Sequence, residues 1–383
     1  MSVERTAVRR IGRRTAIAAL GLAGAGVAAN GIAGCTAPPV PTQVPKPAAD
    51  VAGSQPPPTP TVPASAPAQP QATPMSQSAA TAKPEGTTIR SAPTTPSPAS
   101  KPAATAESPS PARASGVADL AVVRGQNTAD IVRAAVEAVG GIERFVKPGQ
   151  KVVVKPNICV SSAPEYAATT NPEVVAALVA LCREAGAAQV KVLDYGFGGQ
   201  RTSYQVSGIE DAVRKAGGEM VVISPVKWKT TPIPNGKELK SVAIFDDVLT
   251  ADSLINVPIA KHHNLARLTL GMKGLLGVIQ SREPLHYQMG QKLSDLLTVV
   301  RPALTVIDAT RILTANGPQG GNLKDVKRLD TVIASPDIVA ADAYATGLFG
   351  LKPEDLETVR AGAANGIGTM DLSKLKVAQV SRQ

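Results

Sequence analysis

The sequence predicts an α/β fold with a mostly parallel sheet, helices on both faces of the sheet, and a small β-hairpin insertion. From residue 117 onward, strand patterns and helix patterns alternate at the spacing expected for parallel strands joined by helices. Some strand patterns are short β-branched runs, such as Val152–Val154, which are typical of strands buried on both faces. About 267 residues belong to this region, enough for one large domain, so we expect residues 117–383 to form a single α/β domain.

The first two helices have recognisable start signals. After a short predicted strand at 119–124, Asn127 can cap a helix that runs to about residue 139, because apolar residues recur there at helical spacing. A strand at 151–154 follows. Asn171 and Pro172 then predict the start of the second helix, with Asn171 as its cap and Pro172 in its first turn.

The later elements are predicted from apolar periodicity. Strands are expected at 190–193, 220–223, 254–257, 304–307 and 331–334, and helices at 209–216, 293–300 and 337–349. Residues 226–245 depart from this rhythm, because two β-like stretches flank the turn Pro234–Lys237. This pattern predicts the β-hairpin insertion.

The N-terminus predicts export and a lipid anchor. Arg13 and Arg14 precede an apolar run of small residues and resemble a twin-arginine export signal, although Gly12 and Ala16 depart from its usual pattern. Residues 32–35 then match a bacterial lipobox, which makes Cys35 the expected acylated N-terminus. We therefore expect residues 1–35 to be a lipoprotein signal handled by the twin-arginine export machinery. The alternative is an apolar anchor that is never cleaved.

Residues 36–116 predict a disordered tether, because this stretch holds 20 of the 33 prolines and few large apolar residues. The domain is thus expected outside the cytoplasm, lipid-anchored on the outer side of the bacterial cytoplasmic membrane. The net charge of +10 comes mostly from the signal and the tether, which leaves about +4 on the domain. No basic block with interleaved aromatics occurs there, so we expect no nucleic-acid partner.

Cysteine is sparse. Besides Cys35, the chain has only Cys159 and Cys182, and no Cys-x-x-Cys pair occurs, so we expect no iron–sulfur cluster. Cys182 falls on an apolar helical face and is predicted to lie in the core. Cys159 follows a strand end and could line a site, although we favour a buried small side chain there.

All three histidines, His262, His263 and His286, lie within residues 261–286. Lys261, Arg267, Lys273 and Arg282 accompany them in the same segment. Imidazole supplies acid–base chemistry or metal ligation near neutral pH, and a lysine flanked by glycines can approach an anion closely. If the chain is extended here, Lys261 and His263 point to one side and His262 to the other, which favours His263 as the site residue.

Polar residues follow several predicted strands, and a parallel sheet gathers such positions at the carboxyl edge. They are Lys155, Asn157, Asp194, Lys261, His263, Asp308 and Ser335. For any one of them the alternative is a simple turn or helix cap. As a set, they predict a site that holds a negatively charged ligand.

Short motifs occur throughout residues 118–360. They are Lys155-Pro156-Asn157, Thr170–Glu173, Asp194, Asn256-Val257-Pro258 with Lys261-x-His263, Thr269 with Lys273 and Gly277, Asp308, Gly317-Pro318 with Gly321, and Ser335-x-Asp337 with Asp342. Together they resemble the domain of unknown function 362 family. That resemblance implies no settled activity. Many members carry ferredoxin-like clusters whose cysteines are missing here, and Gly274 stands where the family commonly has Asn.

The leading hypothesis is an exported enzyme that acts on a small anionic substrate. In it, Lys155, Asn157, Lys261, Lys273 and Ser335 bind the substrate, while His263 or His286 moves a proton. A divalent metal on Asp194 and Asp308, with His263, is a further expectation. The alternative is a ligand-binding or assembly lipoprotein without chemistry.

Overall fold

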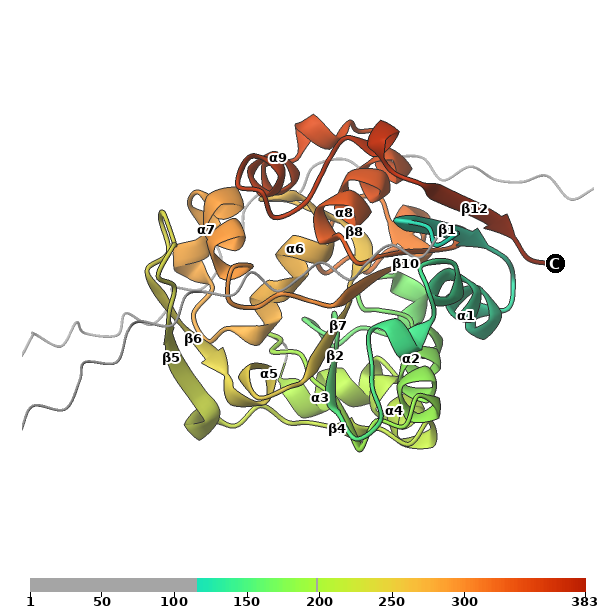
Figure 1. The fold of residues 1–383 in the computed structure, drawn as a ribbon, viewed down its shortest axis with the longest axis horizontal. Helices are drawn as coiled ribbons and strands as arrows, with labels where there is room; N and C mark the ends of the chain where they lie inside the picture. The colour runs from blue at the N-terminus through green and yellow to red at the C-terminus, as the bar shows by residue number, and fades with distance from the viewer. Residues whose placement is uncertain (1–115, 198) are drawn as a thin grey trace, which may run out of the picture. The chain divides into compact units, whose positions relative to one another are not determined.

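The computed structural model describes residues 116–197 and 199–383 (Figure 1). The expected signal at 1–35, with its lipidation site Cys35, lies outside the described residues. The same holds for nearly all of the expected tether at 36–116. Within the described part of the chain, no helix combines the length and the apolar character needed to cross a membrane.

The core of the domain is a large twisted sheet whose strands run in the order β12-β1-β11-β10-β7-β2-β3-β4. Every neighbouring pair in it is parallel except the two pairs that involve β11. The strands are β1 (Leu120–Arg124), β2 (Lys151–Pro156), β3 (Gln189–Val192), β4 (Glu219–Met220), β7 (Ser253–Val257), β10 (Leu304–Leu313), β11 (Val326–Ser335) and β12 (Val377–Ser381). The predicted mostly parallel sheet is confirmed.

Helices cover both faces of this sheet, as the alternation of strand and helix patterns predicted (Figure 1). Alternate residues of each strand point to opposite faces and so enter two separate apolar cores. One core joins the sheet to α1 (Thr128–Ala138), α2 (Pro172–Glu184), α3 (Gln200–Val206) and α4 (Ile209–Lys215). The other joins it to α5 (Asp246–Leu249), α6 (Gly271–Gly274), α7 (Met289–Leu296), α8 (Ile338–Thr346) and α9 (Glu357–Ala364).

The predicted helix starts of α1 and α2 are confirmed by their caps. The Asn127 side chain accepts a hydrogen bond from the Asp130 backbone at 3.2 Å, and Asn171 accepts one from Glu173 at 3.0 Å. Each cap satisfies a backbone N–H that the first turn of a helix leaves without a partner. The predicted hairpin is also present, as β5 (Trp228–Pro232) paired antiparallel with β6 (Ser241–Phe245).

Two strands differ from the prediction in ways that matter for the site. The strand expected at 304–307 continues to Leu313, because Asp308 is accommodated inside it rather than ending it. The strand expected at 331–334 belongs to β11, which runs antiparallel to its neighbours, so its carboxyl end lies at the opposite edge of the sheet.

The segment after β7 was not predicted as strand. It forms β8 (Ile259–His263), which pairs parallel with β10, and β9 (Arg267–Thr269), which pairs antiparallel with β8. This short extension of the sheet carries Lys261 and His263 beyond the carboxyl end of β7. It leads directly into α6 and the following turn, η4 (Leu275–Val278).

Candidate functional site

A small cavity lies where the carboxyl ends of β2 and β3 meet the β8–α6 segment. Its lining is strongly basic, and Asp194 is the only carboxylate in the described part of it. The cavity volume is about 40 Å³, which is room for roughly three waters. Polar and charged lining residues are Asn157, Cys159, Asp194, Tyr195, Lys261, His263, Thr269, Lys273, Arg282 and His286.

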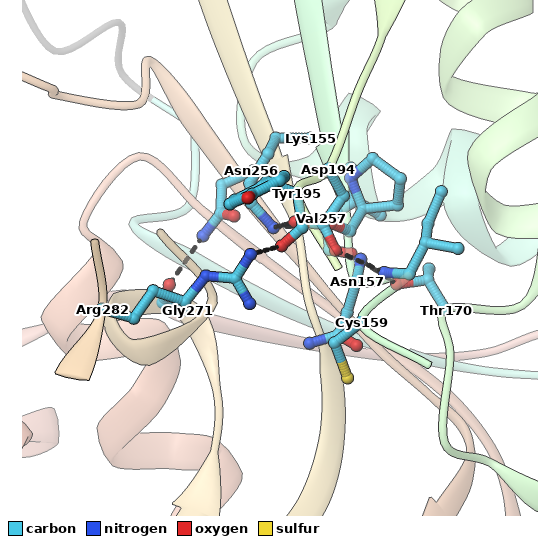
Figure 2. Close-up of polar contacts among 12 residues, drawn as sticks. Lys155, Asn157, Cys159, Thr170, Asp194, Tyr195, Asn256, Val257, Gly271 and Arg282 are labelled. Atoms are coloured by element: carbon cyan, nitrogen blue, oxygen red, sulfur yellow. Dashed lines mark hydrogen bonds and ion pairs between the residues drawn. The ribbon is translucent and has the colours of Figure 1, made fainter. Parts of the chain in front are cut away.

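The one carboxylate of the cavity wall is already engaged. Lys155 Nζ lies 2.6 Å from Asp194 Oδ1, and both side chains are buried (Figure 2). The other oxygen of Asp194 accepts a hydrogen bond from the Ile158 backbone at 2.6 Å. Lys155 also donates to the Pro156 carbonyl at 2.6 Å. Since Lys155 stands behind the wall, the pair leaves the cations on the cavity side without a counter-ion.

Lys261 is held by the protein itself. Its ammonium lies within hydrogen-bond distance of four acceptors, one more than its three protons can serve. They are Asn157 Oδ1 at 3.3 Å, Cys159 Sγ at 3.2 Å, Ala168 O at 2.5 Å and Pro318 O at 3.0 Å. Lys261 therefore acts as a fixed positive charge that joins strand β8 to the loops around the cavity.

Lys273 is the cation with free bonding capacity. It lines the cavity, only 9% of it is exposed, and its ammonium forms no hydrogen bond or ion pair with any residue that the structure describes. Burial, together with the charge of Lys261, lowers the pKa of Lys273 to about 8. A buried lysine without a partner is rare because an unpaired charge is costly to desolvate, so the cavity favours a negative ligand.

The first turn of α6 fixes where Lys273 points. Asp342, which is fully buried on α8, accepts hydrogen bonds from the backbones of Gly271 at 2.6 Å and Met272 at 2.9 Å. The side chain of Asn256 on β7 donates to the Gly271 carbonyl at 3.0 Å (Figure 2). Helix α6 is thus tied to both the sheet and α8.

His263 lines the cavity as a neutral imidazole. Its Nδ1 accepts hydrogen bonds from the backbones of Leu265 at 3.1 Å and Ala266 at 3.4 Å, which assigns the proton of the neutral ring to Nε2. Burial first, and then the charges of Lys273 and Lys261, lower the pKa of His263 to about 3. As expected from strand alternation, His262 does not line this cavity, and its Nδ1 accepts instead from the Gly317 backbone at 3.1 Å.

Two further polar groups point to a missing partner. Arg282 Nε and Thr269 Oγ1 are both buried, and neither has a hydrogen-bond partner in the described chain. The Arg282 guanidinium donates to the Tyr195 carbonyl (Figure 2). It also lies 4.6 Å from the ring centres of both Tyr195 and Phe197. Buried polar groups nearly always have hydrogen-bond partners, so two such groups without a partner in one cavity wall favour a polar ligand there.

The structure brings together most of the predicted site residues. Asn157, Asp194, Lys261, His263, Lys273 and His286 line the cavity, and Lys155 stands directly behind it. Asp308 does not line it. The carboxylate of Asp308 is fully buried within β10, where it accepts from the Asn171 backbone at 2.7 Å and from Thr310 Oγ1 at 2.7 Å. It joins the start of α2 to the sheet.

Ser335 is also placed elsewhere. The expectation that it follows a parallel strand was wrong, since β11 is antiparallel and ends at the opposite edge of the sheet. Its hydroxyl donates to the Asp119 carbonyl at 2.7 Å and accepts from the Asp337 backbone at 3.0 Å. These contacts fasten the β11–α8 junction to the start of β1.

The residues present do not fit the divalent metal expected on Asp194, Asp308 and His263. Asp194 is paired with Lys155, Asp308 lies inside the sheet, and His263 presents a protonated nitrogen rather than a lone pair. Among residues 116–197 and 199–383, no three His, Cys, Asp or Glu side chains gather in a way that could hold a metal ion.

The structure corrects the prediction made for Cys159. It was expected to be a small buried side chain, but it is partly exposed and lines the cavity beside Lys261. Its position after β2, two residues beyond Asn157, was the available signal. No sequence signal marked Thr269 and Arg282, because the burial of their unpartnered atoms depends on tertiary contacts. Cys182 lies in the core, as predicted.

Comparison with known proteins identifies relatives but no established activity. The family described as a domain of unknown function (DUF362) matches residues 152–347, a range that includes every lining residue of the cavity. A thylakoid-associated protein of Synechocystis sp. is 27% identical over 245 residues, which cover 62% of this chain and 74% of that protein.

Two solved structures show partial similarity. One is the lactate racemase apoprotein from Thermoanaerobacterium thermosaccharolyticum, with 12% identity, a TM-score of 0.39, and coverage of 61% of this chain and 57% of that one. The other is a protein from Thermotoga maritima, with 10% identity, a TM-score of 0.35, and coverage of 59% and 60%. In both cases the chain spans less than two thirds of the length of the solved protein.

Proposed function

The chain belongs to the DUF362 family, and on this premise we propose that it is an enzyme acting on a small anionic substrate in the cavity. The observation that carries this proposal is Lys273, a buried lysine that lines the cavity without a partner among the described residues. An anionic group would supply the missing counter-charge and gain a charge-assisted hydrogen bond.

The other lining residues support distinct roles. Arg282 Nε and Thr269 Oγ1 lack partners among the described residues and suit donation to an anionic group, and His263 Nε2–H can donate to a substrate oxygen. Lys261 contributes positive potential, since its own protons are taken. His286, also in the cavity wall, is the imidazole we assign to proton transfer.

A ligand-binding lipoprotein without chemistry is the second candidate. The small volume favours it, because about 40 Å³ accommodates an anionic group with only a few further atoms. The two candidates share the anion site and differ only in whether the bound molecule is turned over.

A thermal-shift screen of the full-length protein tests the shared step. Carboxylates, phosphate and sulfate should each raise the melting temperature of the wild type, whereas Lys273→Met should abolish the shift. Lys229→Met, which removes an exposed lysine of the hairpin strand β5, is the matched control and should respond like the wild type. Equal shifts in Lys273→Met and the wild type would refute the anion site.

We further propose that the protein is exported and lipid-anchored on the outer side of the bacterial cytoplasmic membrane. The lipobox ending at Cys35 and the arginine pair support this location, and the name of the thylakoid-associated Synechocystis relative supports association with a membrane. Mass spectrometry of membrane-extracted protein should find a mature chain that begins at a diacylated Cys35. An intact Met1, or an unmodified Cys35, would contradict it.

A further inference from the structure

We propose that Lys273 forms a Schiff base with a small carbonyl compound that also carries a carboxylate or phosphate group. The inference rests on the proposed function, because it uses the same anion site. It adds a covalent step and a substrate class, such as a 2-oxo acid or an aldehyde phosphate. Three features of the cavity lead to it: the free amine of Lys273, the fixed cations around that amine, and separate donors for an anionic group.

Lys273 is the only one of the three site lysines whose nitrogen is free to react. Lys155 is bound to Asp194 and the Pro156 carbonyl, and Lys261 has more acceptors than protons. Neither nitrogen can leave these contacts without stranding a buried charge or carbonyl. The Lys273 nitrogen, in contrast, lines the cavity and has no partner to give up in the described chain.

The surroundings of Lys273 favour the neutral amine, which is the nucleophilic form. Its side chain is nine-tenths buried, and Lys261 and Arg282 raise the positive potential at its nitrogen. A lysine pKa of about 8 leaves roughly a tenth of the amine neutral at pH 7, against well under a thousandth for an ordinary exposed lysine. A desolvated lysine next to another cation is an established way of activating an amine.

The cavity wall also offers different donors for the two groups of such a substrate. Arg282 Nε and Thr269 Oγ1 are buried donors without partners, and they suit the carboxylate or phosphate oxygens. His263 Nε2–H is a neutral donor and suits the carbonyl oxygen, which gains negative charge during attack. Lys273 lines the same cavity as these donors, so its amine is available to the carbonyl carbon of a substrate held by them.

The step balances without any redox partner. The lone pair of the neutral Lys273 nitrogen forms a bond to the carbonyl carbon, and the carbonyl π electrons move to oxygen. A proton shift from nitrogen to oxygen gives the carbinolamine. A further proton, which we assign to His286, lets the oxygen leave as water while the nitrogen lone pair forms the C=N bond. The product is a protonated imine, whose positive charge is matched by the anionic group of the substrate.

Reductive trapping of the full-length protein tests this step. The protein is incubated with pyruvate and cyanoborohydride, and the site of the reduced adduct is mapped by peptide mass spectrometry. A parallel arm uses glycolaldehyde phosphate in place of pyruvate to distinguish carboxylate from phosphate recognition. Acetone serves as the carbonyl control without a charge. Lys273→Arg keeps the charge but removes the amine, and Lys229→Arg is the control for an exposed lysine.

We expect a saturable adduct on Lys273 with at least one of the two anionic carbonyls. Excess sulfate should suppress this adduct, and acetone should give a yield lower by roughly tenfold or more. The adduct should be lost in Lys273→Arg but not in Lys229→Arg. Labelling spread evenly over exposed lysines, or unchanged in Lys273→Arg, would overturn the inference. If pyruvate raises the melting temperature but leaves Lys273 unlabelled, the Schiff base fails while the proposed anion site stands. If pyruvate neither stabilises nor labels the protein and sulfate also has no effect, both fail.

Discussion

Lys155 Nζ and Asp194 Oδ1 form a buried ion pair of 2.6 Å at the carboxyl ends of two neighbouring strands, β2 and β3. The pair uses the only carboxylate in the described cavity wall. It therefore decides the electrostatic character of the site, because the remaining polar groups of the wall are cations, imidazoles, a thiol, and hydroxyl or amide groups. Such a wall favours an anionic ligand.

Breaking this pair should be costly. Lys155→Met leaves the buried Asp194 carboxylate without its cation, and we expect the free energy of unfolding to fall by about 3–5 kcal/mol. Urea denaturation followed by circular dichroism measures it. Lys155→Met combined with Asp194→Asn should cost clearly less than the sum of the two single changes. Additive costs, or a Lys155→Met loss below about 1 kcal/mol, would show that the pair is not coupled in this way.

Gly277 is required by the close approach of η4 to this pair. A Cβ atom at this position would lie 1.7 Å from Asp194 Oδ1 and 2.9 Å from Lys155 Cε. We expect Gly277→Ala to lower the free energy of unfolding by about 1–3 kcal/mol and to weaken anion binding, since Asp194 must move. Gly347→Ala is the matched control, because nothing lies within 4 Å of its added Cβ, and it should be near neutral. Equal stabilities of the two variants would contradict this packing.

His263 should stay neutral across the physiological range. Its folded pKa of about 3 lies below the usual 6.5, so between these values the unfolded chain binds more protons and stability from this group is lost as the pH falls. Nitrogen-15 NMR should find the Nε2–H tautomer at pH 6. His263→Asn keeps an acceptor for the Leu265 backbone but removes the cavity donor, so it should fold normally and bind anions more weakly. A His263 titration near pH 6.5 would refute the assignment.

Asp342 should give the opposite pH dependence. Burial raises its pKa from 3.8 to about 7, so between these values the folded protein binds more protons and the free energy of unfolding falls as the pH rises. Asp342→Asn removes the titration, and the difference in stability between wild type and variant should therefore change steadily from pH 4 to pH 7. Denaturation curves across this range measure it. A difference independent of pH would mean that Asp342 does not titrate with a raised pKa.

Much of the fold could be predicted from the sequence, because its signals are local. Asn127 and Asn171 cap their helices as their side chains and neighbouring residues indicated. The β-branched run at β2 and the turn before β6 also gave the expected elements. Strand direction was not predictable in the same way. Nothing local distinguishes β11 from a parallel strand, since its direction depends on pairing with β1 and β10, and so Ser335 was misplaced.

The site was predictable to the extent that a strand end marks it. Asn157 follows β2 directly, and Asp194 lies two residues after the end of β3. The alternation along β8 correctly separated His262 from Lys261 and His263. Asp308 failed this rule because hydrogen bonds from Asn171 and Thr310 let a carboxylate sit inside a strand. Which of the three lysines is ion-paired, hydrogen-bonded or without a partner could not be predicted. The partners of a buried lysine depend on acceptors that are distant in sequence.

Sulfate binding measured by titration calorimetry at several pH values tests the central claim most directly. Sulfate keeps its charge over this range, so any pH dependence belongs to the protein. The charged or titratable groups in the cavity wall are Lys261, Lys273, Arg282, His263, His286, Cys159, Tyr195 and Asp194. The wild type should bind sulfate with proton uptake, and its affinity should fall by roughly tenfold or more as the pH rises from 7 to 9.5, because Lys273 loses its proton at about pH 8. Lys273→Met should bind weakly at every pH, while Lys229→Met should match the wild type. Sulfate affinity that is the same in Lys273→Met as in the wild type, or that does not change with pH, would contradict the account.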